Sequence, residues 1–139
     1  MSEDHDKSSE LTAKFNEAYY AWFTTVRRDS LPQPTPVWFI PENGTYLIFS
    51  MPQVQKVKNI QHNPKVALSY APDPDGEAYY VVMGEAVIDP SVPPLTQVAA
   101  YLDKYASGIQ RLGWTPESMA ADFTVAIRVT PSRVRGQFE

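Results

Sequence analysis

A two-residue turn between two β-rich runs is the feature that most constrains this fold. Asn43-Gly44 separates PTPVWFI from TYLIFS. Asn-Gly favours the left-handed backbone of a tight turn, so the two runs are predicted to pair as an antiparallel hairpin. KVALSY and AYYVVMGEAVI form a second predicted pair, joined by the turn-rich PDPDGE. The chain is therefore expected to be built on an antiparallel sheet.

Helices are predicted to interrupt this sheet. Ser8 or Ser9 is placed to cap a first helix, whose apolar positions are Leu11, Phe15, Tyr19 and Trp22. A long helix is predicted from Leu95 to Leu112 with Gly113 ending it, and Thr115-Pro116 is expected to open a short helix. FTVAIRVTPSRVRG alternates as a closing strand. About six strands interrupted by helices predict an α+β fold, mainly β, built as a small antiparallel barrel.

Composition excludes several kinds of site. The 139 residues fit one domain, and the chain has no cysteine and two histidines, which argues against disulfides, thiol nucleophiles and histidine-based metal or catalytic sites. The net charge is −4, and the first ten residues carry most of it. We expect residues 1–10 to be a disordered acidic tail and residues 11–139 to be the domain. The near-neutral remainder argues against nucleic-acid binding, and with no membrane-spanning run a cytoplasmic protein is expected.

The segment SMPQVQKVKNIQHNPKVAL, which begins at Ser50, is the strongest candidate for a binding site. A strand leads into a short helix with an apolar stripe of Val54, Val57 and Ile60, and the free N–H groups at such a junction suit a phosphate. Ser50 would add a hydroxyl and Lys56 a positive charge. Lys56 and Asn59 are three residues apart and are expected to share one face.

The same pattern also permits a plainer interpretation. Lys58 is roughly 200° around an ideal helix from Lys56, so the two lysines can be solvated side chains above a packed stripe. Trp38 lies in an apolar strand, where it can be either a core residue or a wall for a flat ring. Tyr79 and Tyr80 alternate faces of their strand, so at most one of them faces any given groove.

Several short motifs, taken together, resemble a known family. The chain is similar to the pyridoxamine-phosphate-oxidase-like split-barrel superfamily, and more narrowly to the branch that uses the deazaflavin coenzyme F420 rather than FMN. The resemblance runs from about Ala21 to Gly136. It is carried by Thr25-Val26-Arg27, Pro32-Gln33-Pro34, Pro36-Val37-Trp38-Phe39, Ser50, Lys56-Val57-Lys58-Asn59-Ile60, Asn63-Pro64-Lys65-Val66 and Thr130-Pro131-Ser132-Arg133-Val134-Arg135-Gly136.

The resemblance implies a six-stranded split β-barrel that forms a homodimer, with a cofactor in each groove between subunits. Ser50, Lys56, Lys58 and Asn59 would hold the cofactor phosphate, with Lys56 the principal ligand. Val37 and Trp38 would lie along the flavin-like ring, and Tyr79 would approach from the other subunit. No catalytic residue and no metal ligand is implied.

The function implied is an oxidoreductase that transfers hydride from reduced F420 to a small organic acceptor, since the cofactor supplies the reactivity. One alternative is an FMN-dependent oxidase or reductase of the same fold, which the phosphate site cannot distinguish. A second alternative is a non-catalytic carrier of a cofactor or tetrapyrrole, in which a haem ligand would have to be His62 or a group other than histidine.

Overall fold

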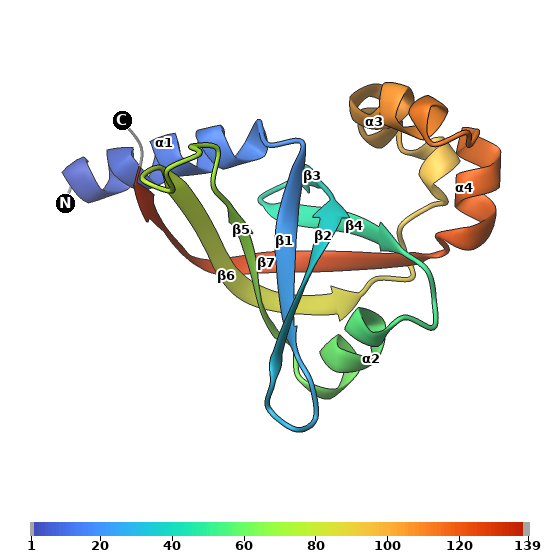
Figure 1. The fold of residues 1–139 in the computed structure, drawn as a ribbon, viewed down its shortest axis with the longest axis horizontal. Helices are drawn as coiled ribbons and strands as arrows, with labels where there is room; N and C mark the ends of the chain where they lie inside the picture. Colours follow the sequence, from blue (N-terminus) through green and yellow to red (C-terminus); the bar gives the residue numbers. More distant parts are fainter. Residues whose placement is uncertain (1, 138–139) are drawn as a thin grey trace.

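The computed structural model describes residues 2–137, with side chains from residue 9 onward. One curled antiparallel sheet forms a half-barrel, and the helices lie around it (Figure 1). The elements in chain order are α1 (Ser2–Asn16), β1 (Tyr20–Val26), β2 (Pro32–Trp38), β3 (Ile40–Glu42), β4 (Thr45–Ser50), α2 (Gln55–His62), β5 (Lys65–Tyr70), β6 (Tyr79–Ile88), the 3₁₀ turn η1 (Leu95–Gln97), α3 (Ala99–Arg111), α4 (Pro116–Asp122) and β7 (Val125–Gln137).

The order of strands explains why the sheet curls. The strands follow the order β2-β1-β5-β6-β7-β4-β3, so the two edge strands are β2 and β3. These two strands are consecutive in the chain, and Phe39 alone separates them. Because one residue spans only about 3.5 Å, both edges of the sheet must meet at Phe39. The α+β split-barrel prediction is therefore confirmed.

The sheet has seven strands rather than the expected six, because Phe39 interrupts one long extended run. The Phe39 N–H donates to the hydroxyl of Tyr105 at 2.8 Å. The Phe39 carbonyl accepts from the amino group of Lys104 at 2.8 Å and from the Tyr105 hydroxyl at 2.9 Å. Helix α3 thus satisfies both backbone groups of Phe39, and the strand can change neighbours at that point without leaving them unpaired.

Two hydrophobic cores lie on opposite faces of the sheet. Strand β4 shows this most clearly, since Tyr46 and Ile48 pack into one core while Leu47 and Phe49 pack into the other. The first core fills the barrel and includes residues of α1 and α2, and the second lies beneath α3 and α4. Because both faces of β4 are covered, TYLIFS is a nearly continuous apolar run instead of an alternating one.

The predicted turn at Asn43-Gly44 is present, but the hairpin of PTPVWFI with TYLIFS is only partly correct. Of the first run, Ile40 alone pairs with β4, because Phe39 ends β2 and the residues up to Trp38 pair with β1 instead. Asn43 and Gly44 have φ angles of 51° and 79° and connect β3 to β4, with Glu42 opposite Thr45. Strands β5 and β6 pair as expected, with Tyr70 opposite Tyr80. Thr115 caps α4 through a capping box with Ser118, as its position before a proline indicates.

The helix boundaries differ from the prediction. Helix α1 extends over Ser2–Asn16, so it begins before the expected cap at Ser8 or Ser9. It overlaps the predicted acidic tail, whose mobility in solution stays a prediction. Leu11 and Phe15 are buried as expected, whereas Tyr19 and Trp22 lie beyond the end of α1 and are partly exposed.

The long helix predicted from Leu95 to Leu112 is divided. It consists of η1 and α3 on either side of Val98, whose ψ of 91° is extended. Gly113, with a φ of 78°, follows α3 as predicted. No helix in the described part of the chain is long and apolar enough to cross a membrane.

Candidate functional site

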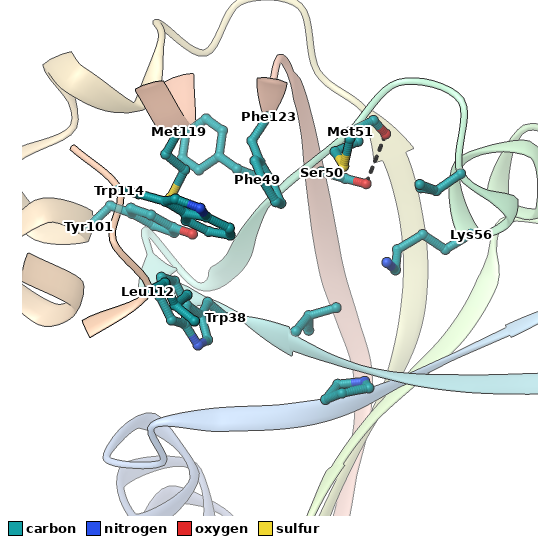
Figure 2. Close-up of a pocket in the computed structure, with 13 residues that line it drawn as sticks. Trp38, Phe49, Ser50, Met51, Lys56, Tyr101, Leu112, Trp114, Met119 and Phe123 are labelled. Atoms are coloured by element: carbon teal, nitrogen blue, oxygen red, sulfur yellow. Dashed lines mark hydrogen bonds between the residues drawn. The ribbon is translucent and has the colours of Figure 1, made fainter. Parts of the chain in front are cut away.

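A cavity that we call the main cavity, because four of the predicted site residues line it, lies where strands β2 and β4 separate, between α2 on one side and the α3–α4 unit on the other (Figure 2). It measures about 350 Å³. Strand β2 forms its ladder with β1, while β4 forms ladders with β3 and β7, so the cavity marks the split in the barrel. Its lining residues are Pro36, Val37, Trp38, Phe49, Ser50, Met51, Val54, Lys56, Tyr101, Leu112, Trp114, Met119 and Phe123.

One end of the main cavity is polar. Ser50, at the end of β4, is 3% exposed, and its hydroxyl donates to the carbonyl of Met51 at 3.0 Å. Lys56 enters from the first turn of α2 with its amino nitrogen toward the cavity (Figure 2). Burial lowers the pKa of Lys56, and no carboxylate in the described part of the chain forms an ion pair with it. This half-buried cation is therefore available to an anionic ligand.

The other end of the main cavity is aromatic. Trp38 stacks on Tyr105 with ring centroids 4.4 Å apart and an interplanar angle of 5°. Gly108 of α3 makes this packing possible, because a Cβ there would lie 3.0 Å from the Trp38 ring and would meet the Tyr19 hydroxyl. Trp38 is thus held against α3 by one face while it also lines the cavity, which combines the two roles proposed from sequence.

Four of the predicted site residues meet in the main cavity: Val37, Trp38, Ser50 and Lys56. Lys58 and Asn59 line a different pocket of about 310 Å³, which we call the basic pocket and which also contains Arg27, Arg28, Asp29 and Gln55. Lys56 and Asn59, which were expected to share one face of α2, line different cavities. The roughly 200° between the two lysines is reflected in their separate pockets.

Asn59 is held by the protein itself. It is 2% exposed, and its amide nitrogen donates to the Thr25 hydroxyl at 2.9 Å and to the Gln33 side-chain oxygen at 3.1 Å. Its amide oxygen accepts from the side chain of Gln55 at 2.8 Å. These bonds fasten α2 to the β1–β2 hairpin. They thereby fix the orientation of the helix, in which Lys56 faces the main cavity and Lys58 faces the basic pocket.

Tyr79 lies apart from both pockets. It lines a hollow of about 200 Å³ on strands β1, β5 and β6, together with Tyr20, Trp22, Tyr70 and Tyr80. Tyr79 is 42% exposed and Tyr80 is 4% exposed, so the alternation expected along the strand is present. Within one chain, Tyr79 and Lys56 therefore belong to different surfaces.

Sequence reasoning missed the residues that α3 and α4 bring to the main cavity. Tyr101 and Met119 follow helical periodicity, which indicates core packing and nothing more. Trp114 could have been recognised as a candidate, because it directly follows Gly113, which ends the helix. A large aromatic residue there is not part of the apolar face of that helix. Arg27 entered only as part of the resemblance motif Thr25-Val26-Arg27, and Arg28 was given no site role.

The curled sheet with a cavity at its split defines the class of the protein as a split β-barrel. The family described as pyridoxamine 5'-phosphate oxidase matches residues 8–138, and the chain belongs to this family. Among curated proteins, none matches. The fold and the family thus agree with the resemblance found in the sequence.

Three solved structures show the range of proteins with this fold. An F420 reductase is 29% identical to this chain, with a TM-score of 0.65, covering 88% of this chain and 93% of that one. An FAD-binding protein from Mesorhizobium loti is 20% identical, with a TM-score of 0.69 and coverages of 93% and 92%. HutZ, the haem storage protein of Vibrio cholerae, is 15% identical, with a TM-score of 0.64 and coverage of 92% of each chain.

The residues present fit a flavin-type cofactor. A phosphate needs a cation without a competing carboxylate, and Lys56 meets that condition. A flat ring needs an apolar wall, and Pro36, Val37 and Trp38 provide one along β2. Both features line the same cavity, so one elongated ligand can contact both.

Proposed function

We propose that this protein binds coenzyme F420 in the main cavity and transfers hydride from its reduced form to a small organic acceptor. The observation that carries the proposal is that one cavity contains both the apolar wall of Val37 and Trp38 and Lys56, which forms no ion pair with any carboxylate of the described residues. The 29% identity to an F420 reductase supports F420 as the cofactor. The bound deazaflavin would supply the hydride chemistry.

The protein's own residues would bind, orient and exclude water. Lys56 would bind the phosphate, and the ligand's negative charge would favour the charged form of the amine against the effect of burial. The Ser50 hydroxyl has acceptor capacity left after donating to Met51, and it can turn to donate to a phosphate oxygen. Trp38, fixed by Tyr105, would keep one face of the ring dry.

Lys58 and Asn59 take different parts in this proposal. Lys58 lies in the basic pocket, so it would reach the cofactor only if the ligand extends around α2 or a second chain changes the arrangement. Asn59 would act by holding α2 in place, because the protein's own groups already occupy its amide.

A homodimer is part of the same proposal. Tyr79 and Lys56 lie on different surfaces of one chain, so both can contact one ligand if Tyr79 comes from the partner subunit. We expect sedimentation analysis to give twice the mass of the 15.6 kDa chain. If the protein is a monomer and still binds F420 with full affinity, Tyr79 does not contribute to the cofactor site.

The test is a titration of purified protein with F420 and separately with FMN, followed by fluorescence. We expect Lys56→Ala to weaken F420 binding about 10- to 100-fold, because it removes one charge-assisted contact. Lys65→Ala is the control, since Lys65 is an exposed lysine at the start of β5. Circular dichroism should show that both variants stay folded.

The outcomes separate the alternatives. If FMN copurifies in stoichiometric amount and F420 does not bind, the cofactor is FMN and the proposal of F420 is wrong. Tight binding without oxidation of the reduced cofactor by any acceptor would indicate a carrier. Unchanged F420 affinity in Lys56→Ala would show that Lys56 does not bind the phosphate and is an ordinary solvated lysine.

A further inference from the structure

Tyr101 carries a hydroxyl that faces the main cavity and has no hydrogen-bond partner among the described residues. The residue as a whole is 1% exposed, and its ring packs edge-on against Phe49 at 5.0 Å and at a tilt of 48° against Tyr105 at 4.9 Å. Among the residues that the structure describes, none forms a hydrogen bond with its hydroxyl. Tyr101 lines the main cavity, and its oxygen points toward the cavity in Figure 2.

Among the described residues, the buried side-chain atom without a hydrogen-bond partner is Thr35 Oγ1, so the Tyr101 hydroxyl is open to the cavity, where solvent or a ligand can reach it. Burial, together with neighbouring Tyr105 and Tyr19, raises the pKa of Tyr101. The hydroxyl therefore keeps its proton and can donate. A ligand with an acceptor atom would recover the missing hydrogen bond.

The surroundings of this hydroxyl restrict which ligand can enter. Around it lie the apolar or aromatic side chains of Phe49, Leu112, Trp114, Met119 and Phe123. Lys56 is the one charged residue among the lining residues, and it is at the opposite end of the cavity (Figure 2). An anion at the aromatic end would lose its hydration without gaining a partner.

We propose that Tyr101 is a substrate-binding residue, whose hydroxyl donates a hydrogen bond to the carbonyl oxygen of a neutral, ring-containing substrate packed against Trp114 and Phe123. The partly exposed Leu112 and Trp114 would form the apolar entrance to this subsite. That this ligand is the hydride acceptor follows only if the proposed function is correct. The binding itself is independent of the cofactor.

The probe is a matched pair, 1-tetralone and tetralin, which share a fused-ring skeleton and differ in the carbonyl. Binding to the full chain without added cofactor is measured by ligand-observed NMR. We expect the wild type to bind 1-tetralone about three- to tenfold more tightly than tetralin, the value of one neutral hydrogen bond. Tyr101→Phe should abolish this preference while still binding tetralin.

Tyr20→Phe is the control, because it makes the same chemical change at an exposed tyrosine outside the main cavity. It should keep the preference. A third probe, 2-naphthoate, should bind more weakly than tetralin to Lys56→Ala, in which the polar end no longer supplies a cation, because the aromatic end rejects anions. Equal affinities for 1-tetralone and tetralin in the wild type would overturn the proposal and would indicate that water satisfies the hydroxyl.

The two proposals fail in different ways. A tetralone preference that depends on Tyr101 in a protein that binds neither F420 nor FMN would reject the proposed function and leave the subsite intact. Normal cofactor binding that depends on Lys56, without any tetralone preference, would reject the subsite alone.

Discussion

Tyr101 and Tyr105 lie one turn apart on α3, and both are almost completely buried, but their hydroxyls have opposite surroundings. The Tyr105 hydroxyl accepts from the Phe39 N–H at 2.8 Å and lies 2.6 Å from the carbonyl of Tyr19 and 2.9 Å from that of Phe39. Tyr101 has no such partner in the described chain. Burial alone therefore does not distinguish a structural tyrosine from one available to a ligand, whereas the hydrogen-bond partners of the hydroxyl do.

The largest expected effect comes from removing the satisfied hydroxyl. Tyr105→Phe leaves the buried N–H of Phe39 unpaired, and we expect the free energy of unfolding to fall by about 2–3 kcal/mol. Urea unfolding followed by circular dichroism measures this loss. A loss no larger than that of the surface control Tyr20→Phe, expected to be within about 0.5 kcal/mol, would contradict the structural role.

Gly108→Ala should come next. The new Cβ would crowd the Trp38 ring and the Tyr19 hydroxyl. Overpacking of this kind outweighs the better helix propensity of alanine, so we expect a net loss of about 1–2 kcal/mol and a shift in tryptophan emission as Trp38 moves. Ser107→Ala, at an exposed position of the same helix, should show neither change. An increase in the free energy of unfolding for Gly108→Ala would show that Trp38 can move aside without cost, which contradicts the tight packing against Gly108.

Lys104, which also bonds Phe39, should give a smaller and pH-dependent effect. Burial lowers its pKa from 10.5 to about 8. Between these values the unfolded chain binds more protons than the folded one, so the contribution of Lys104 to stability rises with pH. Because the side chain is half-exposed, we expect less than about 1 kcal/mol.

The measurement compares wild type with Lys104→Met by urea unfolding at about pH 7.5 and about pH 9.5. The wild type should gain stability relative to the variant as the pH rises. A parallel pH dependence in both proteins would show that Lys104 keeps its ordinary pKa.

The smallest effect is expected at the unsatisfied hydroxyl. Tyr101→Phe removes a hydroxyl that has no hydrogen-bond partner among the described residues, so the free energy of unfolding should stay the same or increase by up to about 1 kcal/mol. Chemical unfolding beside Tyr105→Phe gives the contrast directly. A fall in the free energy of unfolding as large as that of Tyr105→Phe would show that the Tyr101 hydroxyl forms a stabilising hydrogen bond and would contradict this prediction.

Much of the fold was predictable because its signals are local. Asn43-Gly44 sets the β3–β4 turn, and Thr115-Pro116 sets the start of α4, each through residues next to the structure that they determine. The break at Phe39 was not predictable. Its cause lies 65 and 66 residues away, in the side chains of Lys104 and Tyr105.

The candidate site was predictable in part for the same reason. Ser50 and Lys56 lie close in sequence, and Trp38 came with the family resemblance, so the polar end and the wall of the main cavity were anticipated. Tyr101 and Trp114 reach the cavity only because α3 and α4 fold back over the sheet. Helix spacing also could not show that the amide nitrogen of Asn59 already donates to Thr25 and Gln33.

The place of β7 in the strand order has a consequence for synthesis on the ribosome. Strands β2, β1, β5 and β6 form one ladder and β4 and β3 form another, and β7 pairs with both β6 and β4. Until β7 has been made, no ladder can connect β6 to β4, and the two groups of strands are linked through the backbone at Phe39 and through the segment with α2 between β4 and β5. Closure of the barrel is therefore a late, long-range event that waits for the final strand rather than growing outward from the first hairpin.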